Sequence, residues 1–251
     1  MKKRLFSFLV LCVFVLTCAI AQAAPEKKRI MVYGDSNSFG WVKDANGIVG
    51  RYPADVRWPD KMGMMLGDEY EVIVEALGGR TTNLDCPVKS GPGLVPGAGM
   101  NGAEYLPAAL ASHMPLDMVI IMLGTNDLMV QHSRKAFDIA MGVGELVSIV
   151  TNGSWQRRTS YAVPKVLVLC PPKVNDKKEG PNQKRFAGAL ERMEVLPGML
   201  QAVTKAAGVD FFDVAAVVPF GEAPDDIHFT PENHAAVAKA VAAEVKKIFA
   251  K

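Results

Sequence analysis

The sequence carries almost no net charge. It has 28 Lys and Arg against 26 Asp and Glu in 251 residues, a formal net charge of +2. The first 23 residues contain three basic residues and no acidic ones, so the remainder has 25 basic and 26 acidic residues, a net charge of about −1. Nucleic acids and anionic membranes attract strongly basic surfaces. The composition therefore indicates neither, and we expect no nucleic-acid partner.

Cysteine is also scarce. Of four cysteines, Cys12 and Cys18 belong to an apolar leader, which leaves Cys86 and Cys170. Neither lies at metal-ligand spacing from anything nearby. An exported pair could form a disulfide, or the two could be separate thiols with Cys170 buried at a strand end. The sequence leaves these alternatives open.

The longest apolar stretch lies at the N-terminus. Lys2–Arg4 form a basic start, Leu5–Ile20 is almost wholly apolar, and Ala21–Gln22–Ala23 has the small-x-small pattern that signal peptidase cleaves. We therefore predict a signal peptide over residues 1–23 and a single domain over residues 24–251.

A membrane anchor and a lipid attachment at Cys18 are the alternatives to cleavage. The apolar stretch is a little shorter than the about 20 residues that span a bilayer, and an Ala-rich cleavage site follows it directly. We expect an exported protein, periplasmic or secreted, with no stable membrane insertion after cleavage.

No internal repeat or low-complexity tract interrupts the mature chain, in which strand and helix patterns alternate. This alternation favours a parallel sheet covered by helices on both faces. The apolar runs predict strands over Ile30–Tyr33, Tyr70–Glu75, Met118–Leu123, Lys165–Leu169 and Asp210–Phe212. Helical spacing predicts helices over Trp58–Leu66, Tyr105–His113, Ala136–Val150, Lys184–Ala207 and Pro231–Phe249.

Proline marks two positions in these helices. Pro197 is predicted to kink or split the helix over Lys184–Ala207. Pro231 fits the first turn of the last helix, behind Thr230 as its N-cap.

Three long connections begin near predicted C-terminal strand ends, and loops of this length tend to be functional. They cover residues 41–57, 78–102 and 171–181. We expect all three to border one cleft.

Three short motifs carry the chemistry. Gly34–Asp35–Ser36 follows the first predicted strand, Gly124–Thr125–Asn126–Asp127 follows the third, and Asp225-x-x-His228 precedes the last helix. Each motif alone is common in ordinary turns. Together, in this order and at these places, they provide the groups for acyl transfer through a serine nucleophile.

A serine nucleophile needs a base, and the chain has only four histidines. His113 ends a helix, where capping is the expected role, and His132 could border the cleft. His234 lies inside the last helix as a surface or packing residue. His228 follows Asp225 by three residues, so one turn could present both side chains together. Asp226 is the alternative partner for this histidine.

The tetrahedral intermediate of acyl transfer needs hydrogen-bond donors for its oxyanion. The Ser36 backbone N–H, the Gly79 backbone N–H and the Asn126 side chain are the candidates. No Gly-x-Ser-x-Gly motif surrounds Ser36, which disfavours the common α/β-hydrolase arrangement.

These motifs resemble the four signature blocks of the SGNH (GDSL-type) hydrolases, and the likeness extends over the whole mature chain. It is greatest to the mycobacterial aryl esterase/acyltransferase branch. The segments that carry it are Ala54–Trp58, Leu77–Asn83, Tyr105–Pro107, Leu116–Asp127 and Ile227–Thr230.

The resemblance implies a three-layer α/β/α sandwich of flavodoxin-like type with a five-stranded parallel sheet. It implies Ser36 as nucleophile, His228 as base and Asp225 as the residue that orients it. It implies Ser36, Gly79 and Asn126 as oxyanion donors, and no metal or organic cofactor. Members of this branch form large oligomers, so a homo-oligomer is one expectation.

We therefore expect a serine esterase that hydrolyses short-chain, acetyl-type esters of small alcohols or phenols through an acyl-enzyme. Its partner is a small-molecule ester, and acyl transfer to alcohols is a side activity. Carbohydrate deacetylation is the first alternative, followed by lysophospholipase or thioesterase action. A binding protein on the same scaffold is the alternative outside enzymes.

Overall fold

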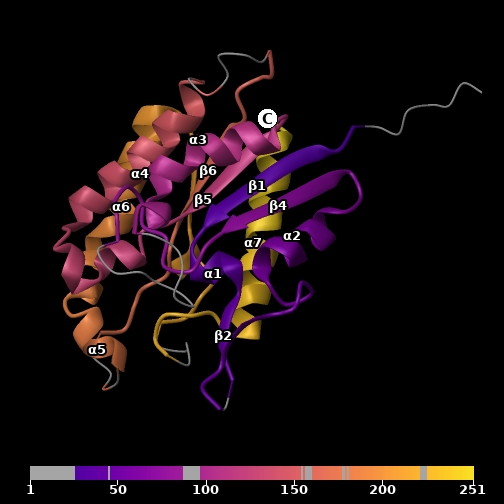
Figure 1. Ribbon diagram of the computed structural model, residues 1–251. Coiled ribbons are helices and arrows are strands. Elements are labelled where there is room, and N and C mark those ends of the chain that lie inside the picture. The colour runs from indigo at the N-terminus through magenta and orange to yellow at the C-terminus, as the bar shows by residue number, and fades with distance from the viewer. Residues whose placement is uncertain are drawn as a thin grey trace, which may run out of the picture.

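A parallel five-stranded sheet forms the centre of the molecule, as the computed structural model shows (Figure 1). The structure describes residues 26–44, 46–86, 97–153, 155, 160–176, 179, 181–220 and 225–251. The predicted signal peptide, residues 1–23, lies outside these residues.

The order of the strands in the sheet is β4-β1-β5-β6-β7, and every neighbouring pair is parallel. All five predicted strands are present, with ends that differ by no more than two residues. They are β1 (Lys28–Gly34), β4 (Tyr70–Ala76), β5 (Met118–Met122), β6 (Lys165–Cys170) and β7 (Asp210–Asp213).

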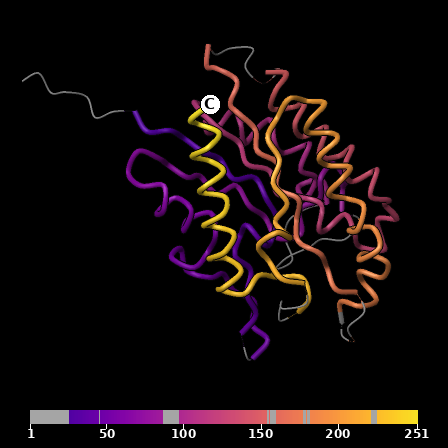
Figure 2. Tube along the Cα trace, turned by 180° about the vertical axis from the view of Figure 1, so that it is seen from behind, coloured from indigo at the N-terminus to yellow at the C-terminus, as the bar shows by residue number. Residues whose placement is uncertain are grey.

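Helices cover both faces of this sheet, which makes the three-layer sandwich that the resemblance implied (Figures 1 and 2). Side chains alternate between the two faces of a strand. In β1, Met31 and Tyr33 therefore join one buried cluster, while Ile30 and Val32 join the other. Because both faces are buried, the strand sequences are continuously apolar.

The first cluster includes side chains of α3 (Gly102–His113), α4 (Ala136–Thr151) and α6 (Ala189–Ala207). The second includes side chains of α2 (Trp58–Leu66) and α7 (Pro231–Phe249). Figure 2, viewed from behind, shows α7 lying along the sheet. Both α2 and α7 have the predicted bounds.

Of the two effects predicted for Pro197, a kink or a split in the fourth helix, the split is wrong. The helical segment is divided instead into α5 (Pro181–Arg185) and α6, and α6 continues through Pro197. Gly188, with φ +75°, stands at the start of α6 in the left-handed region that glycine adopts without strain. Met193, Leu196 and Leu200 are buried around the proline, and their packing offsets the backbone hydrogen bond that proline removes.

The start of α7 is fixed by the predicted cap. The Asn233 N–H donates to Thr230 Oγ1 at 3.2 Å, and the Thr230 N–H donates to Asn233 Oδ1 at 3.2 Å. Pro231 occupies the first turn, where a missing N–H is harmless. This reciprocal cap anchors the chain two residues after His228.

The sequence did not predict a β-hairpin within residues 41–57. It consists of β2 (Trp41–Lys43) and β3 (Val49–Arg51), which pair antiparallel at the lower end of the molecule in Figure 1. It follows α1 (Ser36–Phe39), a single helical turn at the end of β1. The hairpin therefore stands beside the carboxyl ends of the strands.

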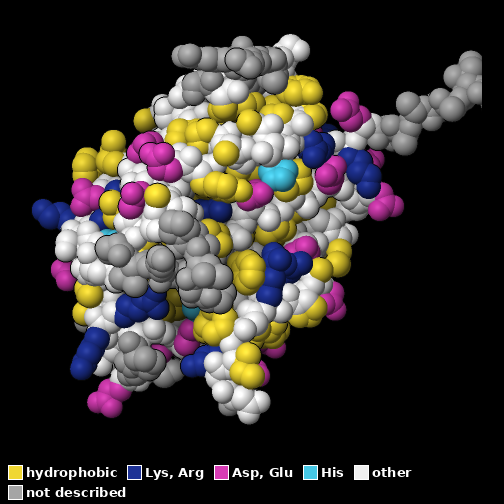
Figure 3. Space-filling view, in the orientation of Figure 1, with side chains coloured by type: hydrophobic (Ala, Val, Ile, Leu, Met, Phe, Trp, Pro, Cys, Tyr) yellow, Lys and Arg dark blue, Asp and Glu magenta, His cyan; other side chains and the backbone are white. Residues whose placement is uncertain are grey.

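On the face drawn in Figure 3, acidic and basic side chains are interspersed and do not gather by sign. Within the part of the chain that the structure describes, every helix falls short of the length or apolarity needed to cross a membrane.

Candidate active site

The strand order reverses at β1, which makes its carboxyl end the natural place for a site. The chain passes from β1 to β4 on one side and returns to β5 on the other. In open α/β sheets, ligands bind in the crevice at such a switch point. The segments that follow β1, β4 and β5 carry Ser36, Gly79 and Asn126, so the fold gathers these three residues at one edge.

Ser36 is the first residue of α1, directly after β1. The Asp35 side chain caps this turn by accepting the Asn37 N–H at 3.0 Å. Gly34 must lack a side chain, because a Cβ there would collide with Ser38 Oγ. The serine is 5% exposed, so its hydroxyl sits in a nearly enclosed position.

Folding brings the distant Asp-x-x-His motif to this serine. His228 Nε2 lies 3.0 Å from Ser36 Oγ, across 192 residues of sequence, and His228 Nδ1 lies 2.6 Å from Asp225 Oδ2. The second oxygen, Asp225 Oδ1, accepts the backbone N–H groups of Ile227 at 3.2 Å and His228 at 2.8 Å. The three side chains form one continuous hydrogen-bonded chain.

The surroundings of Asp225 favour its ionised form. Burial alone would raise the pKa of this carboxyl. The hydrogen bonds and charge of His228, with the N–H groups of His228 and Ile227, outweigh burial and hold the pKa below its ordinary value. Asp225 is therefore a carboxylate at neutral pH and can stabilise an imidazolium.

The structure decides between Asp225 and Asp226. Asp226 Oδ1 accepts a hydrogen bond from Asn175 Nδ2 at 3.3 Å, and its backbone has φ +65°. Because the backbone at Asp226 is left-handed, the side chains of Asp225 and Asp226 point toward different partners. Asp225 is thus the carboxylate at His228.

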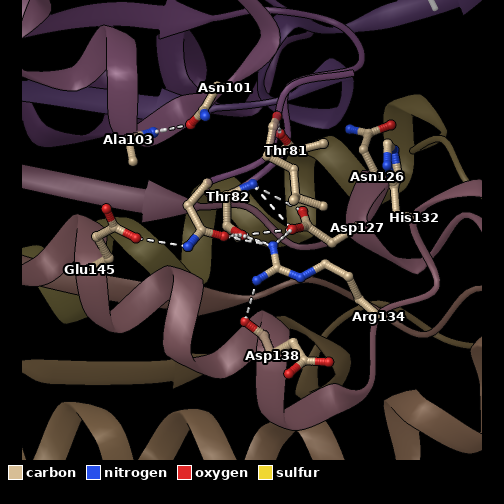
Figure 4. Close-up of polar contacts among 12 residues, drawn as sticks. Thr81, Thr82, Asn101, Ala103, Asn126, Asp127, His132, Arg134, Asp138 and Glu145 are labelled. Carbon is tan, nitrogen blue, oxygen red and sulfur yellow. Dashed lines mark hydrogen bonds and ion pairs between the residues drawn. The ribbon is translucent and has the colours of Figure 1, made fainter. Parts of the chain in front are cut away.

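The other three histidines occupy different positions, and Figure 4 shows His132 next to the Asn126 side chain. His113 Nε2 lies 2.7 Å from Glu75 Oε1, a side-chain hydrogen bond in place of the expected helix cap. His132 lies in a short 3₁₀ turn, Val130–His132. His234 is 1% exposed and accepts the Trp58 N–H at Nδ1, so of its two predicted roles packing is correct. Burial lowers the pKa of His234 to about 4.

The other two candidate oxyanion donors, Gly79 and Asn126, lie in loops that contact each other. Gly79 has φ +88°, a conformation that favours glycine, and a Cβ on the adjacent Gly78 would lie 3.8 Å from Ser36 Cβ. The loop after β4 therefore passes close to the serine. Asn126 Nδ2 donates to the Arg80 carbonyl at 3.0 Å, which leaves the second N–H of this amide for another acceptor.

A buried ionic network fixes the loop after β4 to the loop after β5 (Figure 4). Asp127 accepts the Thr82 N–H at 3.0 Å and the Thr82 hydroxyl at 2.6 Å. Arg134 Nη1 donates to Asp127 at 2.7 Å and also to Asn83 Oδ1 at 2.7 Å. Burial raises the pKa of Asp127 despite these donors. Because Asn126 and Asp127 both hold residues 80–82, the candidate oxyanion donors keep a fixed relative position.

Trp41 of the hairpin covers the imidazole. Its ring stacks on His228 with centroids 3.9 Å apart and an interplanar angle of 25°. Beside this stack is a cavity of about 230 Å³, which we call the hairpin pocket. It is lined by Trp41, Val42, Lys43, Asp44, Tyr52, Asp225, His228 and Phe229. A larger cavity of about 440 Å³, lined by Lys173, Asp213, Ala215, Ala216, Val218, Pro219 and Phe220, contains none of the candidate site residues.

Sequence reasoning missed one residue at the centre of the site. The Asn37 side chain bonds both neighbours of His228, since Nδ2 donates to the Ile227 carbonyl at 3.1 Å and Oδ1 accepts the Phe229 N–H at 3.0 Å. A single asparagine after the serine gives no signal in the sequence, because its partners lie about 190 residues away.

Cys86 and Cys170 are both free and buried, so of the two alternatives left open by the sequence, separate thiols is correct. Burial raises the pKa of the Cys170 thiol. No group of three or more His, Cys, Asp and Glu side chains in the described ranges is arranged to hold a metal ion.

A three-layer sandwich whose switch point holds a serine, a histidine and an aspartate in one hydrogen-bonded chain is the arrangement of a serine hydrolase. Comparison with known proteins places the chain among the SGNH (GDSL-type) hydrolases. The profile of the GDSL-like lipase/acylhydrolase family matches residues 32–236, and the chain belongs to this family. It is a carboxylic ester hydrolase.

Several solved structures are similar along nearly their whole length. A carbohydrate acetylesterase from Sinorhizobium meliloti is 36% identical, with a TM-score of 0.80, over 88% of this chain and 100% of that one. The aryl esterase of M. smegmatis is 39% identical, with a TM-score of 0.79, over 88% of this chain and 99% of that one. A second S. meliloti carbohydrate acetylesterase family member is 29% identical, with a TM-score of 0.77, over 89% and 100%. Comparison with curated protein sequences gave no match.

Proposed function

We propose that this hydrolase cleaves short-chain, acetyl-type esters of small alcohols or phenols through an acyl-enzyme on Ser36. The observation that carries the proposal is the 3.0 Å contact between Ser36 Oγ and His228 Nε2. A serine hydroxyl is a weak nucleophile until a base within hydrogen-bond reach takes its proton.

In the acylation step, Ser36 Oγ attacks the ester carbonyl carbon and His228 Nε2 takes the hydroxyl proton. Asp225, 2.6 Å from His228 Nδ1, stabilises the imidazolium. The oxyanion accepts hydrogen bonds from the Ser36 and Gly79 N–H groups and the Asn126 amide. The intermediate then collapses, and the alcohol leaves with the proton from His228.

In the deacylation step, His228 takes a proton from water, which attacks the acyl carbon. The second intermediate releases the acid and returns the proton to Ser36. One ester and one water thus give one acid and one alcohol.

The hairpin pocket supports a small leaving group. His228 returns its proton to the departing alcohol, so the alcohol must lie beside the imidazole, and His228 is one of the residues that line this pocket. Its volume of about 230 Å³ is below the roughly 300–1,000 Å³ of pockets for drug-sized ligands. Trp41 and Tyr52 provide aromatic walls that favour a phenol or a small alkyl alcohol.

The same pocket supports acyl transfer as a side activity. An alcohol bound against the aromatic walls would meet the acyl-enzyme in place of water and take the acyl group with His228 as base. Product analysis separates the two outcomes: vinyl acetate with benzyl alcohol in water should give benzyl acetate as well as acetic acid.

Carbohydrate deacetylation is the second candidate. Lys43 and Asp44 line the pocket together with the two aromatic residues, and a similar structure is that of a carbohydrate acetylesterase. Charged groups beside aromatic faces suit a hydroxyl-rich alcohol.

The decisive assay uses the purified mature protein, residues 24–251. We expect p-nitrophenyl acetate to be cleaved with a higher kcat/KM than the butyrate or octanoate ester. A preference for acetylated xylan would favour the second candidate, and a preference for octanoate would indicate lysophospholipase or thioesterase action. An organophosphonate should label Ser36, as peptide mass spectrometry reports, and should not label Ser36→Ala. Labelling elsewhere, or none, would overturn the proposal.

We also propose that residues 1–23 are removed during export to the periplasm or the medium. The basic start, the apolar stretch and the small-x-small site support this. N-terminal sequencing of the protein from its native host should begin at Ala24; a chain that begins at Met1 would contradict it.

A further inference from the structure

Asn37 connects the two segments that carry the nucleophile and the base. The residue directly follows Ser36 in α1, and its side chain reaches the irregular segment between Asp225 and the cap of α7. Nδ2 donates to the Ile227 carbonyl at 3.1 Å, and Oδ1 accepts the Phe229 N–H at 3.0 Å. One amide group thus holds the backbone on both sides of His228.

Asn37 is itself held firmly. It is 2% exposed, and its N–H donates to Asp35 Oδ1 at 3.0 Å. Ile227 and Phe229 are also buried, at 7% and 2% exposed. Polar groups in such surroundings depend on their hydrogen bonds, because water is not there to replace a lost partner.

The other contacts of His228 fix different features of the ring. Asp225 holds Nδ1, which sets the tautomer. Trp41 covers one face of the ring, which limits its tilt. The backbone of residues 227–229, however, has to be fixed relative to the serine, and the Asn37 amide makes that connection directly.

We propose that Asn37 is a positioning residue that keeps His228 Nε2 within proton-transfer distance of Ser36 Oγ; the inference rests on the proposed function. The contact is 3.0 Å. A misplacement of about 1 Å in a catalytic constellation costs on the order of 10²-fold in rate. Without the Asn37 amide, residues 227–229 are still followed by the Thr230 cap of α7, but they lose both hydrogen bonds to α1, the turn that carries Ser36.

The family name suggests the test variant. In the motif Gly-Asp-Ser-Leu, from which the GDSL family takes its name, leucine stands where this chain has Asn37. Leucine branches at the same carbon as asparagine, although it is larger, and it makes neither hydrogen bond, so Asn37→Leu removes both of them. Asn37→Asp keeps an acceptor for the Phe229 N–H but replaces the donor to the Ile227 carbonyl with an oxygen.

The matched control is Thr204→Val. Thr204 is 1% exposed, and its hydroxyl donates to the Leu200 carbonyl at 2.9 Å near the end of α6, which leads to the start of β7 at the opposite edge of the sheet. This substitution also removes a buried hydrogen bond, but far from Ser36. It reports what a stability loss alone does to activity.

The experiment measures kcat and KM for p-nitrophenyl acetate, with active sites counted by phosphonate titration, and the rate of phosphonate labelling at Ser36. For Asn37→Leu we expect kcat and the labelling rate to fall together by about 10²-fold, with KM within about twofold. Asn37→Asp should fall between this variant and the wild type, and Thr204→Val should match the wild type. The low-field ¹H resonance of the His228 Nδ1–H should broaden or shift in Asn37→Leu and not in the control.

If Asn37→Leu and Asn37→Asp keep the wild-type kcat per active site, the positioning role is wrong. It is equally wrong if Thr204→Val loses as much activity as they do. Should Asn37→Leu not fold, Asn37→Asp decides the outcome by the same readouts. A wild-type protein that is not labelled at Ser36 would overturn the proposed function instead, so the two failures are distinguishable.

Discussion

Replacing Asp225 by asparagine tests the site most directly, because the structure dictates how the new amide must orient. Asp225 Oδ1 accepts two backbone N–H groups, at 3.2 and 2.8 Å, while Oδ2 faces His228 Nδ1 at 2.6 Å. In Asp225→Asn, the amide oxygen must remain at the Oδ1 position, since an NH₂ group there would face two N–H donors. The NH₂ group then points at His228 Nδ1.

An NH₂ group can bond Nδ1 only when Nδ1 carries no proton. The imidazole proton then resides on Nε2, and this tautomer cannot accept the proton of Ser36. The loss of the same interaction in a serine protease triad lowers kcat by about 10⁴-fold. We expect a similar loss here, about 5 kcal/mol of transition-state stabilisation, with KM within about twofold.

Asp226→Asn is the matched control. Asp226 has φ +65°, and asparagine adopts the left-handed region readily. Its side-chain oxygen can still accept the Asn175 amide hydrogen bond. This variant should therefore keep kcat within about twofold of the wild type.

Steady-state hydrolysis of p-nitrophenyl acetate, corrected for active sites by phosphonate titration, measures both variants. Equal losses in Asp225→Asn and Asp226→Asn, or the larger loss in Asp226→Asn, would refute the assignment. A wild-type rate in Asp225→Asn would refute the tautomer argument as well.

Three further outcomes can be measured. Asn126→Ala should lower kcat by about 10²–10³-fold, because one oxyanion donor is lost; a change confined to KM would contradict that role. Burial lowers the pKa of His234 to about 4, so this side chain binds a proton less readily in the folded state than in the unfolded state. Its contribution to the free energy of unfolding is therefore complete above about pH 6.5 and is lost as the pH falls toward 4. In urea unfolding, the difference in free energy of unfolding between the wild type and His234→Gln should decrease by about 3 kcal/mol over that interval. A difference that does not change with pH would contradict this prediction. Arg134→Met leaves the buried Asp127 carboxylate without its cation and should destabilise the fold by about 3–5 kcal/mol; a loss below about 1 kcal/mol, as for an exposed pair, would show that the pair is unimportant.

Much of the fold follows from local sequence pattern. Helix bounds at Trp58–Leu66 and Pro231–Phe249 agree with the prediction, because the buried stripe of each helix, and the Thr230 cap of the second, are properties of neighbouring residues. The predicted split at Pro197 was wrong because it depends on more than neighbouring residues. Whether a helix tolerates a proline depends on the packing of its apolar face, which local sequence does not report.

The hairpin of residues 41–51 shows the same limit. Its two strands have three residues each, and Val49 is 56% exposed, so the alternation of buried and exposed positions that identifies a strand is absent. Trp41 makes its contact with His228, far along the chain, and only the folded protein brings them together.

By itself, the sequence determined the chemical groups of the site: a serine after the first strand, a glycine and an asparagine after two others, and a histidine before the last helix. Residue type and strand position suffice to predict these groups, because the carboxyl ends of parallel strands lie at the same edge of the sheet. Tertiary structure alone decided three matters: the carboxylate at His228, the free state of the two cysteines, and the contact of Asn37 with both neighbours of His228. Each depends on which groups folding brings together and which it keeps apart. Two residues with equal chemistry, such as Asp225 and Asp226, differ only in the direction in which the folded backbone points their side chains.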